Sequence, residues 1–355
     1  MKVLFIGGTG NISSDCAELL HRRGHEVVIV TRGINPVPAE YRSIIADRKD
    51  PAVMKHALKN EKFDVVINFL GYLVPEVEVD FEVFNGRIGQ YIFISTAMVY
   101  AKPAMKLPIT ENTPKGNPFS DYAQHKEKCE AWLMKKFHKE NFPVTIVRPS
   151  HTYSKLWIPN PISSAGYTFA ARLEEGRPVY MHNSGENLWT LTATSDFAVG
   201  LAGLAGNEKA IGEAFHITSD EAMPWYKIYE EIVAAVGVEK PNIVKIPLEF
   251  ICEHFPELIC WLKGDKAEPA VFDNSKIKRF VPDFVCRKPF GEGIRESVNW
   301  MRAHPDQKKH NPKVDDYCDR VVAAWMEEGK KRRVFLADHA KRVTGSAERR
   351  GTEKE

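Results

Sequence analysis

The chain starts with a glycine-rich turn that limits what it can fold into. A short apolar run, KVLFI, is followed by GGTG and then by SSDCAELLHRR, whose apolar residues have helical spacing. Gly7, Gly8 and Gly10 thus stand where a strand turns into a helix. Glycine permits such a turn and lets the backbone, here with Thr9, approach a phosphate at the helix N-terminus. The segment predicts a dinucleotide-binding loop, although a purely structural turn could carry the same glycines.

Ser13 stands where such a loop often has a further glycine. The last glycine of the motif mainly eases packing of the helix on the sheet. Serine is nearly as small, and its hydroxyl could cap the helix or bind a phosphate. That Ser13 merely fits the available space is an equal alternative.

Apolar and amphipathic segments alternate over the first 150 residues. The apolar runs with strand character include HEVVIVTRG, FDVVINFLG, QYIFIST and PVTIVRPS. Helical patterns lie between them, among them DPAVMKHALKNEK and SDYAQHKEKCEAWLMKKFHKEN. This alternation predicts a parallel sheet with helices on both faces, and continuous apolar strands are typical of its buried centre. We expect an α/β fold, a doubly wound parallel sheet of the Rossmann type.

The pattern loosens after Ser150, which predicts a division of the chain. The expected parts are an NAD(P)-binding domain (1–154, with a returning segment near 190–217), a smaller C-terminal α/β lobe for the substrate (155–189 and 218–304), a helical extension (305–343) and a disordered tail (344–355).

Composition argues against several classes of protein. The 355 residues suffice for one large domain or two fused lobes, and a formal charge of +2 gives little reason to expect a nucleic-acid partner. The six cysteines form no CxxC pair, so we expect neither a metal site nor a disulfide framework. Scattered thiols fit a reducing cytoplasm. No apolar stretch reaches the roughly 18 residues of a membrane span, and the N-terminal run is too short for a signal peptide.

The end of the second strand bears on the choice of cofactor. Domains that prefer NAD usually carry Asp or Glu there, to bind the ribose 2′-hydroxyl. Here Thr31 and Arg32 occupy that place. A guanidinium suits a 2′-phosphate, which favours NADP over NAD, unless Arg32 is a solvated loop residue. Asp47, after the next short strand, could bind the adenine amino group or start the following helix.

Two further stretches predict an active site. Ser95 and Thr96 end the strand in YIFIST, and SDYAQHKEK places Tyr122 and Lys126 four residues apart, on one helix face. A nearby ammonium and the positive ring of the cofactor would lower the tyrosine pKa, so that the phenol could exchange a proton with a carbinol. The Thr96 hydroxyl would orient the same substrate oxygen. A YxxxK pair alone often arises by chance. It indicates an active site here because it occurs together with the glycine loop and with Ser95 and Thr96 at the end of a strand.

Together these features resemble the extended short-chain dehydrogenase/reductases, the NAD-dependent epimerase/dehydratase family. The resemblance runs from Met1 to about Arg302 through IGGTGNIS, ADRKD, VVINFLG, FISTAMVY, PITENTP, YAQHK, VRPSHTY, TSDFAVGL, EAFHITSDE, FDNSKIKR and PFGEGIRESVNW. It implies a catalytic triad of Thr96, Tyr122 and Lys126. The other positions that it implies at the cofactor are Gly7, Gly8, Thr9, Gly10, Asn11, Ile12, Phe69, Leu70, Gly71, Ser95, Pro149 and Ser150, with Arg148 on the same strand as Pro149.

The chain departs from the family pattern directly after Thr96. Members that dehydrate sugars carry an Asp-Glu acid/base pair there, and decarboxylating members keep a Glu, whereas this chain has Ala97 and Met98. Elimination of water needs a positioned proton donor and acceptor. The departure argues against a 4,6-dehydratase or a decarboxylase and leaves epimerisation, or net oxidation or reduction of a carbinol.

A second departure concerns the substrate. Trp189 stands where nucleotide-sugar epimerases often carry a diphosphate-binding Arg, and His151 replaces the family's Asn. Trp189 could stack on a sugar or base or lie in the core, and His151 could bind substrate or serve as a second acid/base. Lys155 and Arg172 could contact an anionic substrate. The nucleotide part of the substrate is therefore in doubt, and a free sugar, sugar acid or other polyol is a contender.

Two functional hypotheses follow. The first is an NAD(P)-dependent sugar epimerase or oxidoreductase, acting on a small sugar or nucleotide-sugar without a nucleic-acid or membrane partner, and forming a homodimer by analogy with similar folds. The second is a non-catalytic dinucleotide sensor or RNA-associated protein on the same fold, which the basic C-terminal segment would support. The Thr-Tyr-Lys set favours the enzyme, because a sensor has no need of it.

Overall fold

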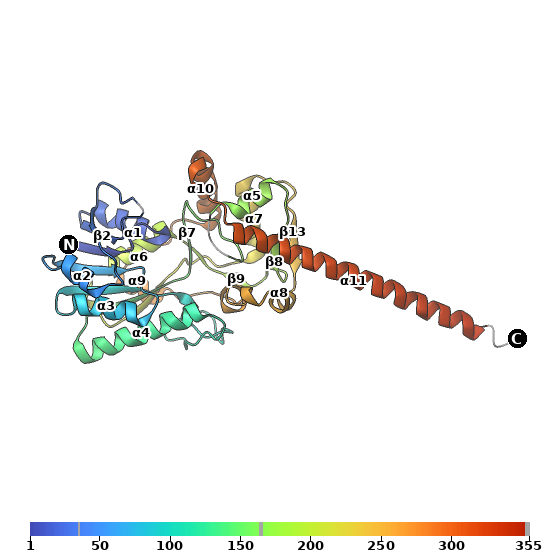
Figure 1. Cartoon of the computed structure of the whole chain (residues 1–355), viewed down its shortest axis with the longest axis horizontal. Helices are drawn as coiled ribbons and strands as arrows, with labels where there is room; N and C mark the ends of the chain where they lie inside the picture. Colours follow the sequence, from blue (N-terminus) through green and yellow to red (C-terminus); the bar gives the residue numbers. More distant parts are fainter. Residues whose placement is uncertain (35, 163–165, 352–355) are drawn as a thin grey trace.

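A parallel sheet organises the N-terminal part of the molecule. The computed structural model describes residues 1–34, 36–162 and 166–351, with side chains of the last helix as far as residue 331 (Figure 1). In this described part, seven strands form one sheet in the order β11-β6-β5-β4-β1-β2-β3, with every pair parallel. Their bounds are β1 (Lys2–Ile6), β2 (Glu26–Thr31), β3 (Arg42–Ile45), β4 (Phe63–Asn68), β5 (Ile88–Ile94), β6 (Val144–Pro149) and β11 (Ala214–Ile217).

Helices cover both faces of the sheet, because the apolar strands alternate their side chains between two cores. Val3 and Phe5 lie in a buried cluster with residues of three helices, α1 (Asn11–Arg22), α6 (Thr194–Leu204) and α9 (Ser275–Phe280). Leu4 and Ile6 lie in a second cluster with residues of α2 (Pro51–Ala57), α3 (Val74–Phe84) and α4 (Asp121–Glu140). The expected doubly wound parallel fold is thereby confirmed.

The chain returns to this sheet after an excursion. Helix α6 contacts α1, and β11 pairs with β6, so the sheet contains residues from the segment expected to return near 190–217. Between β6 and β11 lie β7 (His151–Tyr153), α5 (Thr168–Glu174), β8 (Val179–His182), β9 (Leu188–Trp189) and β10 (Leu191–Ala193). The domain limits given above stay a prediction.

A smaller lobe is built around two further cores. Its remaining elements are β12 (Met223–Pro224), α7 (Trp225–Val236), β13 (Ile243–Ile246), α8 (Leu248–His254), the π-helical turn η4 (Leu262–Lys266) and α10 (Phe290–Ala303). One core joins residues of α5, α7 and α10, and the other joins residues of α8 to the first turns of the last helix, α11 (Pro312–Gly351). Strands β8 and β13 pair in parallel between them.

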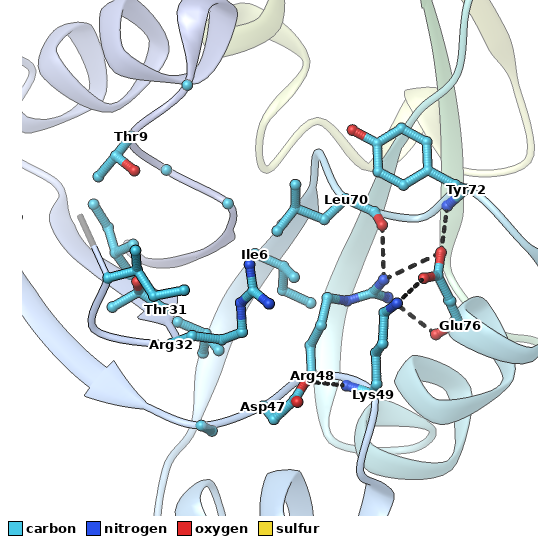
Figure 2. A pocket seen from close by; sticks show the side chains of 17 residues that line it. Ile6, Thr9, Thr31, Arg32, Asp47, Arg48, Lys49, Leu70, Tyr72 and Glu76 are labelled. Atoms are coloured by element: carbon cyan, nitrogen blue, oxygen red, sulfur yellow. Dashed lines mark hydrogen bonds and ion pairs between the residues drawn. The ribbon is translucent and has the colours of Figure 1, made fainter.

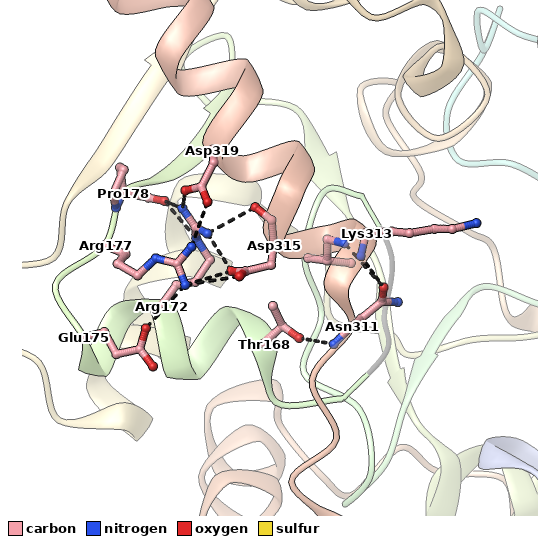
Figure 3. A network of polar contacts seen from close by, with 10 residues as sticks. Thr168, Arg172, Glu175, Arg177, Pro178, Asn311, Lys313, Asp315 and Asp319 are labelled. Carbon is pink, nitrogen blue, oxygen red and sulfur yellow. Dashed lines mark hydrogen bonds and ion pairs between the residues drawn. The ribbon is translucent and has the colours of Figure 1, made fainter.

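Helix α11 extends far beyond the rest of the molecule, and its first turns are fastened to α5 (Figures 1 and 3). The Arg172 guanidinium, 1% exposed, donates to Asp315 Oδ1 and Asp319 Oδ1, each at 2.6 Å. Arg177 pairs with the same two carboxylates. The sequence suggested Arg172 as a contact for an anionic substrate. That suggestion is wrong, because the side chain is buried between α5 and α11 and lines neither of the cavities described below.

The C-terminal end differs from expectation. Helix α11 continues to Gly351, so residues 344–351 are helical where the sequence predicts disorder, and residues 352–355 lie outside the described part. A charged composition lowers the drive to bury surface, but it does not prevent a helix that has already been nucleated from continuing. No helix in the described part of the chain combines the length and the apolar character that crossing a bilayer requires.

Candidate active site

The glycine loop forms one wall of a cavity at the carboxyl ends of β1, β2 and β3 (Figure 2). Gly7 has a φ of +87°, and a Cβ there would meet Leu70 Cγ at 2.5 Å, so conformation and space both require glycine. Beyond Gly10, α1 begins at Asn11. The cavity measures about 430 Å³. The predicted cofactor residues that line it are Gly7, Gly8, Thr9, Gly10, Arg32, Asp47 and Leu70.

Ser13 contributes to the loop rather than to the cavity. It is buried, and the Gly10 N–H donates to Ser13 Oγ at 2.8 Å. The hydroxyl thus satisfies a backbone group at the start of α1, which is the capping alternative considered above. At Asn11, Oδ1 accepts a hydrogen bond from Ser154 Oγ, and Nδ2 is buried without a hydrogen-bond partner among the described residues. Ile12 lines a second cavity.

The far wall of the first cavity depends on Arg48, which sequence reasoning missed although it lies in the quoted ADRKD motif. Its guanidinium donates to the Leu70 carbonyl at 2.7 Å and to Asp80 Oδ2 at 3.0 Å, so it fixes the loop after β4. Lys49, beside it, also lines the cavity. Asp47 accepts a hydrogen bond from the Lys49 N–H, whereas Asp50 caps α2, so the carboxylate that starts this helix is not Asp47.

A second cavity, of about 300 Å³, adjoins the first one, because Tyr72 lines both. Thr96, Tyr122 and Lys126 all line it. Other predicted site residues on its wall are Phe69, Ser95, Pro149, Ser150, His151 and Trp189. Gly71 lines neither cavity, but its carbonyl oxygen accepts a hydrogen bond from Lys126.

Lys126 is buried and bound to backbone. Its Nζ donates to the carbonyl oxygens of Gly71 and Ile94, both at 2.7 Å, and lies 6.0 Å from the centre of the Tyr122 ring. Burial lowers the pKa of Lys126 from 10.5 to about 7. The lysine is therefore held in place beside Tyr122, and its ammonium group loses its proton as the pH rises through about 7.

The Tyr122 phenol keeps its proton strongly in the protein alone. Burial raises its pKa well above the usual range, and the neighbouring Tyr72 adds to this effect, while a hydrogen bond with Thr96 acts in the opposite direction. The rings of Tyr72 and Tyr122 are 6.2 Å apart. Thr96 in turn accepts a hydrogen bond from the Met98 N–H at 3.2 Å, within the short 3₁₀ turn η1 (Ala97–Val99).

His151 and Trp189, which also line this cavity, interact with each other. Trp189 is 2% exposed, and its Nε1–H donates to His151 Nδ1 at 3.3 Å. Burial lowers the pKa of His151 well below 6.5, with a further contribution from Lys266. The imidazole is therefore neutral at pH 7, with Nδ1 as the acceptor. Trp189 lies in the core and also lines the cavity, so the core alternative is confirmed, whereas stacking on a sugar or base stays a prediction.

One further candidate, Lys155, lies outside the second cavity. Its Nζ is 5.3 Å from the centre of the Trp300 ring, and the residue does not line the cavity. Wall residues that sequence reasoning missed are Lys102, Trp157, Trp261, Asp265 and Lys266. No motif marks them, because tertiary folding brings them in from separate loops. Among the described residues, no group of three His, Cys, Asp or Glu side chains could hold a metal ion.

The first cavity fits a dinucleotide on its own chemistry. The N-terminus of a 12-residue helix suits a pyrophosphate, and Gly10 leaves the approach open, since a Cβ there would meet only Ser13 Oγ, at 3.4 Å. The buried, unpartnered Asn11 Nδ2 is a donor next to this loop. Arg32 and Asp47 are available at the ends of β2 and β3 for the ribose and adenine side.

Known proteins are similar to this chain over most of its length. The model of the NAD dependent epimerase/dehydratase family matches residues 3–83 and 81–217. The chloroplast stem-loop binding protein of 41 kDa b from Arabidopsis thaliana is 32% identical over 265 residues, which are 70% of this chain and 67% of that protein. The 2′-dehydrokanamycin reductase of Streptomyces kanamyceticus is 26% identical over 291 residues, 81% of each chain.

Solved structures share the fold. The UDP-glucose 4-epimerase from Bifidobacterium longum, in complex with NAD+ and UDP, superposes with a TM-score of 0.69 at 18% identity, covering 86% of this chain and all of that one. The family match extends from the first strand to β11 and includes the glycine loop, Thr96, Tyr122 and Lys126. The chain belongs to the NAD dependent epimerase/dehydratase family.

Proposed function

We propose that this protein is an NAD(P)-dependent enzyme that oxidises, reduces or epimerises a carbinol of a sugar. The observation that carries the proposal is that Thr96, Tyr122 and Lys126 line one cavity, which adjoins the cavity of the glycine loop at Tyr72. A cofactor spanning from one cavity to the other would bring its reactive end to these three side chains.

Each of the three residues has a separate task. A bound nicotinamide would supply the hydride chemistry. The Tyr122 phenol exchanges a proton with the substrate oxygen, and the Thr96 hydroxyl donates a hydrogen bond to the same oxygen. Because burial raises the Tyr122 pKa, a nearby positive charge is needed to make the phenolate accessible, and Lys126 supplies that charge when it is protonated.

The reaction is hydride transfer without elimination of water or loss of carboxylate. Ala97 and Met98, in the turn after Thr96, carry no acid or base, so this turn supplies neither the proton donor nor the acceptor that an elimination would need there. Relatives named as a reductase and as epimerases support both net reduction and epimerisation.

NADP is the preferred cofactor in this proposal. Arg32 and Lys49 both line the first cavity, where they offer two cations for a 2′-phosphate; the carboxylates on the same wall are Asp47 and Glu76, the latter 3.8 Å from Lys49 Nζ. The substrate is a sugar or sugar derivative without a nucleotide. Nucleotide-sugar epimerases often carry a diphosphate-binding Arg at the position of Trp189, and here that side chain is buried and bound to His151.

The test begins with the purified protein. Denaturing it and quantifying the released nucleotide distinguishes an epimerase, which retains cofactor, from an oxidoreductase, which exchanges it. Turnover of a panel of sugars with NADP+ or NADPH is then compared between wild type and Tyr122→Phe. We expect the variant to lose about 10²- to 10⁴-fold in kcat and to bind dinucleotide as before. Tyr72→Phe, which removes a hydroxyl from the neighbouring ring, is the matched control and should stay within a few-fold of wild type. Unchanged activity of Tyr122→Phe would refute the proposal.

A second candidate function is binding of RNA. It is favoured by the relative named as a stem-loop binding protein, at 32% identity, and by the basic sequence at the C-terminal end. Such binding should weaken steeply as salt is raised, because it depends on the release of counterions from phosphates. Titration of a stem-loop RNA at low salt tests it, and absence of binding there would remove this candidate.

A further inference from the structure

The charged groups on the wall of the second cavity are unbalanced. Among the described residues that line it, three are lysines, Lys102, Lys126 and Lys266, and one is a carboxylate, Asp265. Lys126 is bound to two backbone carbonyls beside Tyr122. Lys102 and Lys266 therefore share a single carboxylate on a wall that the proposed catalytic step does not use.

Lys266 is a buried cation with only its chain neighbour as counter-ion. Its side chain is 4% exposed, and Nζ lies 3.0 Å from Asp265 Oδ2 and 5.1 Å over the Trp261 ring. Burying an ammonium is costly unless charges and hydrogen bonds compensate it. A buried lysine on the wall of a cavity therefore indicates a ligand that contributes negative charge.

The turn that carries Lys266 is held rigidly. It is the last residue of η4, a π-helical turn, and such turns are frequent at functional sites. The Lys266 carbonyl oxygen accepts from Trp225 Nε1 and Asn187 Nδ2, both at 2.8 Å. These two bonds fix the backbone from which the ammonium extends.

The same turn is bound to the segment with the proposed catalytic residues. Asn117 Nδ2 donates to the Gly264 carbonyl at 2.7 Å and to the Met98 carbonyl at 2.9 Å, which joins η4 to the turn after Thr96. A Cβ on Gly264 would lie 3.3 Å from Phe119, just ahead of α4. Lys266 is therefore placed in a fixed relation to Thr96 and Tyr122.

Lys102 adds a cation that nothing neutralises directly. Among the described residues its ammonium makes no direct ion pair or hydrogen bond, and the charges that act on it are those of Asp265 and Glu268. Burial lowers its pKa, while Asp265 and Glu268 act against that change. An ammonium that is partly removed from water without a partner is available to an anion that enters the cavity.

We infer that Lys102 and Lys266 form a counter-site for an acidic group, a carboxylate or a phosphate, carried on the sugar that reacts at Tyr122. The inference rests on the proposed function. Lys102 and Lys266 line the same cavity as Thr96 and Tyr122, so an acidic group bound by the two lysines would belong to the molecule that reacts there. The 300 Å³ of this cavity lies at the lower end of ligand pockets, which suits one acidic sugar better than a nucleotide sugar.

Calorimetric titration of the full chain tests the inference. The Tyr122→Phe variant, saturated with NADP+, prevents turnover, and the probes are glucuronate, glucose 6-phosphate, UDP-glucose and neutral glucose. We expect one acidic monosaccharide to bind at least about 10-fold more tightly than glucose, because its acidic group can accept charge-assisted hydrogen bonds from the two ammonium groups. Preference for glucuronate or for glucose 6-phosphate distinguishes a carboxylate from a phosphate.

Variants assign the effect to the two lysines. Lys266→Gln and Lys102→Gln should each remove most of the preference for the acid. Lys155→Gln, with its ammonium over Trp300 and outside the cavity, should keep it. Lys102 is partly exposed, so its variant remains informative if Lys266→Gln does not fold.

Three results would overturn the inference. They are equal binding of glucose and both acids, tighter binding of UDP-glucose than of either acid, and a preference that survives in Lys102→Gln and any folded Lys266→Gln. Dinucleotide binding and the Tyr122→Phe loss are measured separately, so failure of the proposed function is recognised independently.

Discussion

The ammonium of Lys126 is held between two carbonyl groups, yet burial brings its pKa from 10.5 to about 7. A lysine with a lower pKa in the folded than in the unfolded chain destabilises the fold while it is protonated. This cost is fully present below about pH 7. It is relieved as the pH rises toward 10.5, because over that interval the unfolded chain still binds a proton that the folded chain has released.

We therefore expect wild type to gain stability relative to Lys126→Met between about pH 7 and about pH 10. The gain should approach about 1.4 kcal/mol per pH unit in the middle of that interval. Urea unfolding of both proteins, without cofactor, measures it. Lys128→Met changes an exposed lysine of the same helix and serves as the control. A difference between wild type and Lys126→Met that does not change with pH would show that Lys126 is not desolvated.

A second prediction at the scale of one residue concerns Arg32 and the preference for NADP over NAD. Replacing it with Asp should reverse the preference from NADP to NAD, because the guanidinium would bind a 2′-phosphate whereas a carboxylate accepts from a 2′-hydroxyl. We expect the ratio of the two Kd values to shift by about 10- to 100-fold, given roughly 1.5–3 kcal/mol for a charge-assisted hydrogen bond. Titration of both dinucleotides measures the ratio, and Lys49→Ala shows how much of the preference belongs to the other cation. No shift in Arg32→Asp would mean that Arg32 is solvated.

At the scale of elements, the attachment of α11 to α5 is asymmetric. Arg172 is 1% exposed, whereas Asp315 and Asp319 are 35% and 51% exposed. Removing the arginine leaves two carboxylates that water can solvate. Removing both carboxylates leaves a buried guanidinium with backbone carbonyls as its remaining partners, such as that of Pro178 at 2.8 Å.

We expect the double variant Asp315→Asn, Asp319→Asn to lower the free energy of unfolding more than Arg172→Met does. The loss should reach up to the roughly 3–5 kcal/mol of an uncompensated buried charge. In the Arg172→Met background the same double change should cost little, because no buried charge remains. Arg177→Met, at 36% exposure, should cost about 1 kcal/mol or less. Urea unfolding of these variants gives the coupling energy, and additive costs would contradict the asymmetry.

The elements differ in how far the sequence could predict them. Strands such as β1, β2, β5 and β6 were predictable because they are continuous apolar runs, and the glycine loop because Gly7 must adopt a positive φ against Leu70. Lys266 was not predictable, since it reaches the cavity through a π-helical turn some 140 residues after Tyr122 and no local pattern marks it. Arg172 was misassigned because its partners lie on α11, far along the chain. The roles of Thr96, Tyr122 and Lys126 stay predictions.

For the whole molecule, the first turns of α11 belong to a core and the rest projects away from the body (Figure 1). Val314, Cys318, Val321 and Val322 are buried against α8, and Trp325 packs on the same cluster. Ending the chain after Lys331 should therefore change the free energy of unfolding by about 0.5 kcal/mol or less.

Ending it after Asn311 should remove the apolar residues of that cluster and destabilise the smaller lobe far more, because each large side chain lost from a core costs about 2–5 kcal/mol. Thermal unfolding of the two truncated proteins measures both effects. A large loss from the first truncation would show that the projecting helix stabilises the fold. Sedimentation of the full chain and of the same truncations tests the dimer, which stays a prediction.

The wall of the second cavity also gives the protein an optical property. Three of its seven tryptophans, Trp157, Trp189 and Trp261, face the same space of about 300 Å³. Indole emission depends on local polarity, so a sugar that displaces water there should change the intrinsic fluorescence of the unmodified chain. The protein thus carries a built-in reporter for its own ligand, with which libraries of candidate sugars can be screened before any reaction is known.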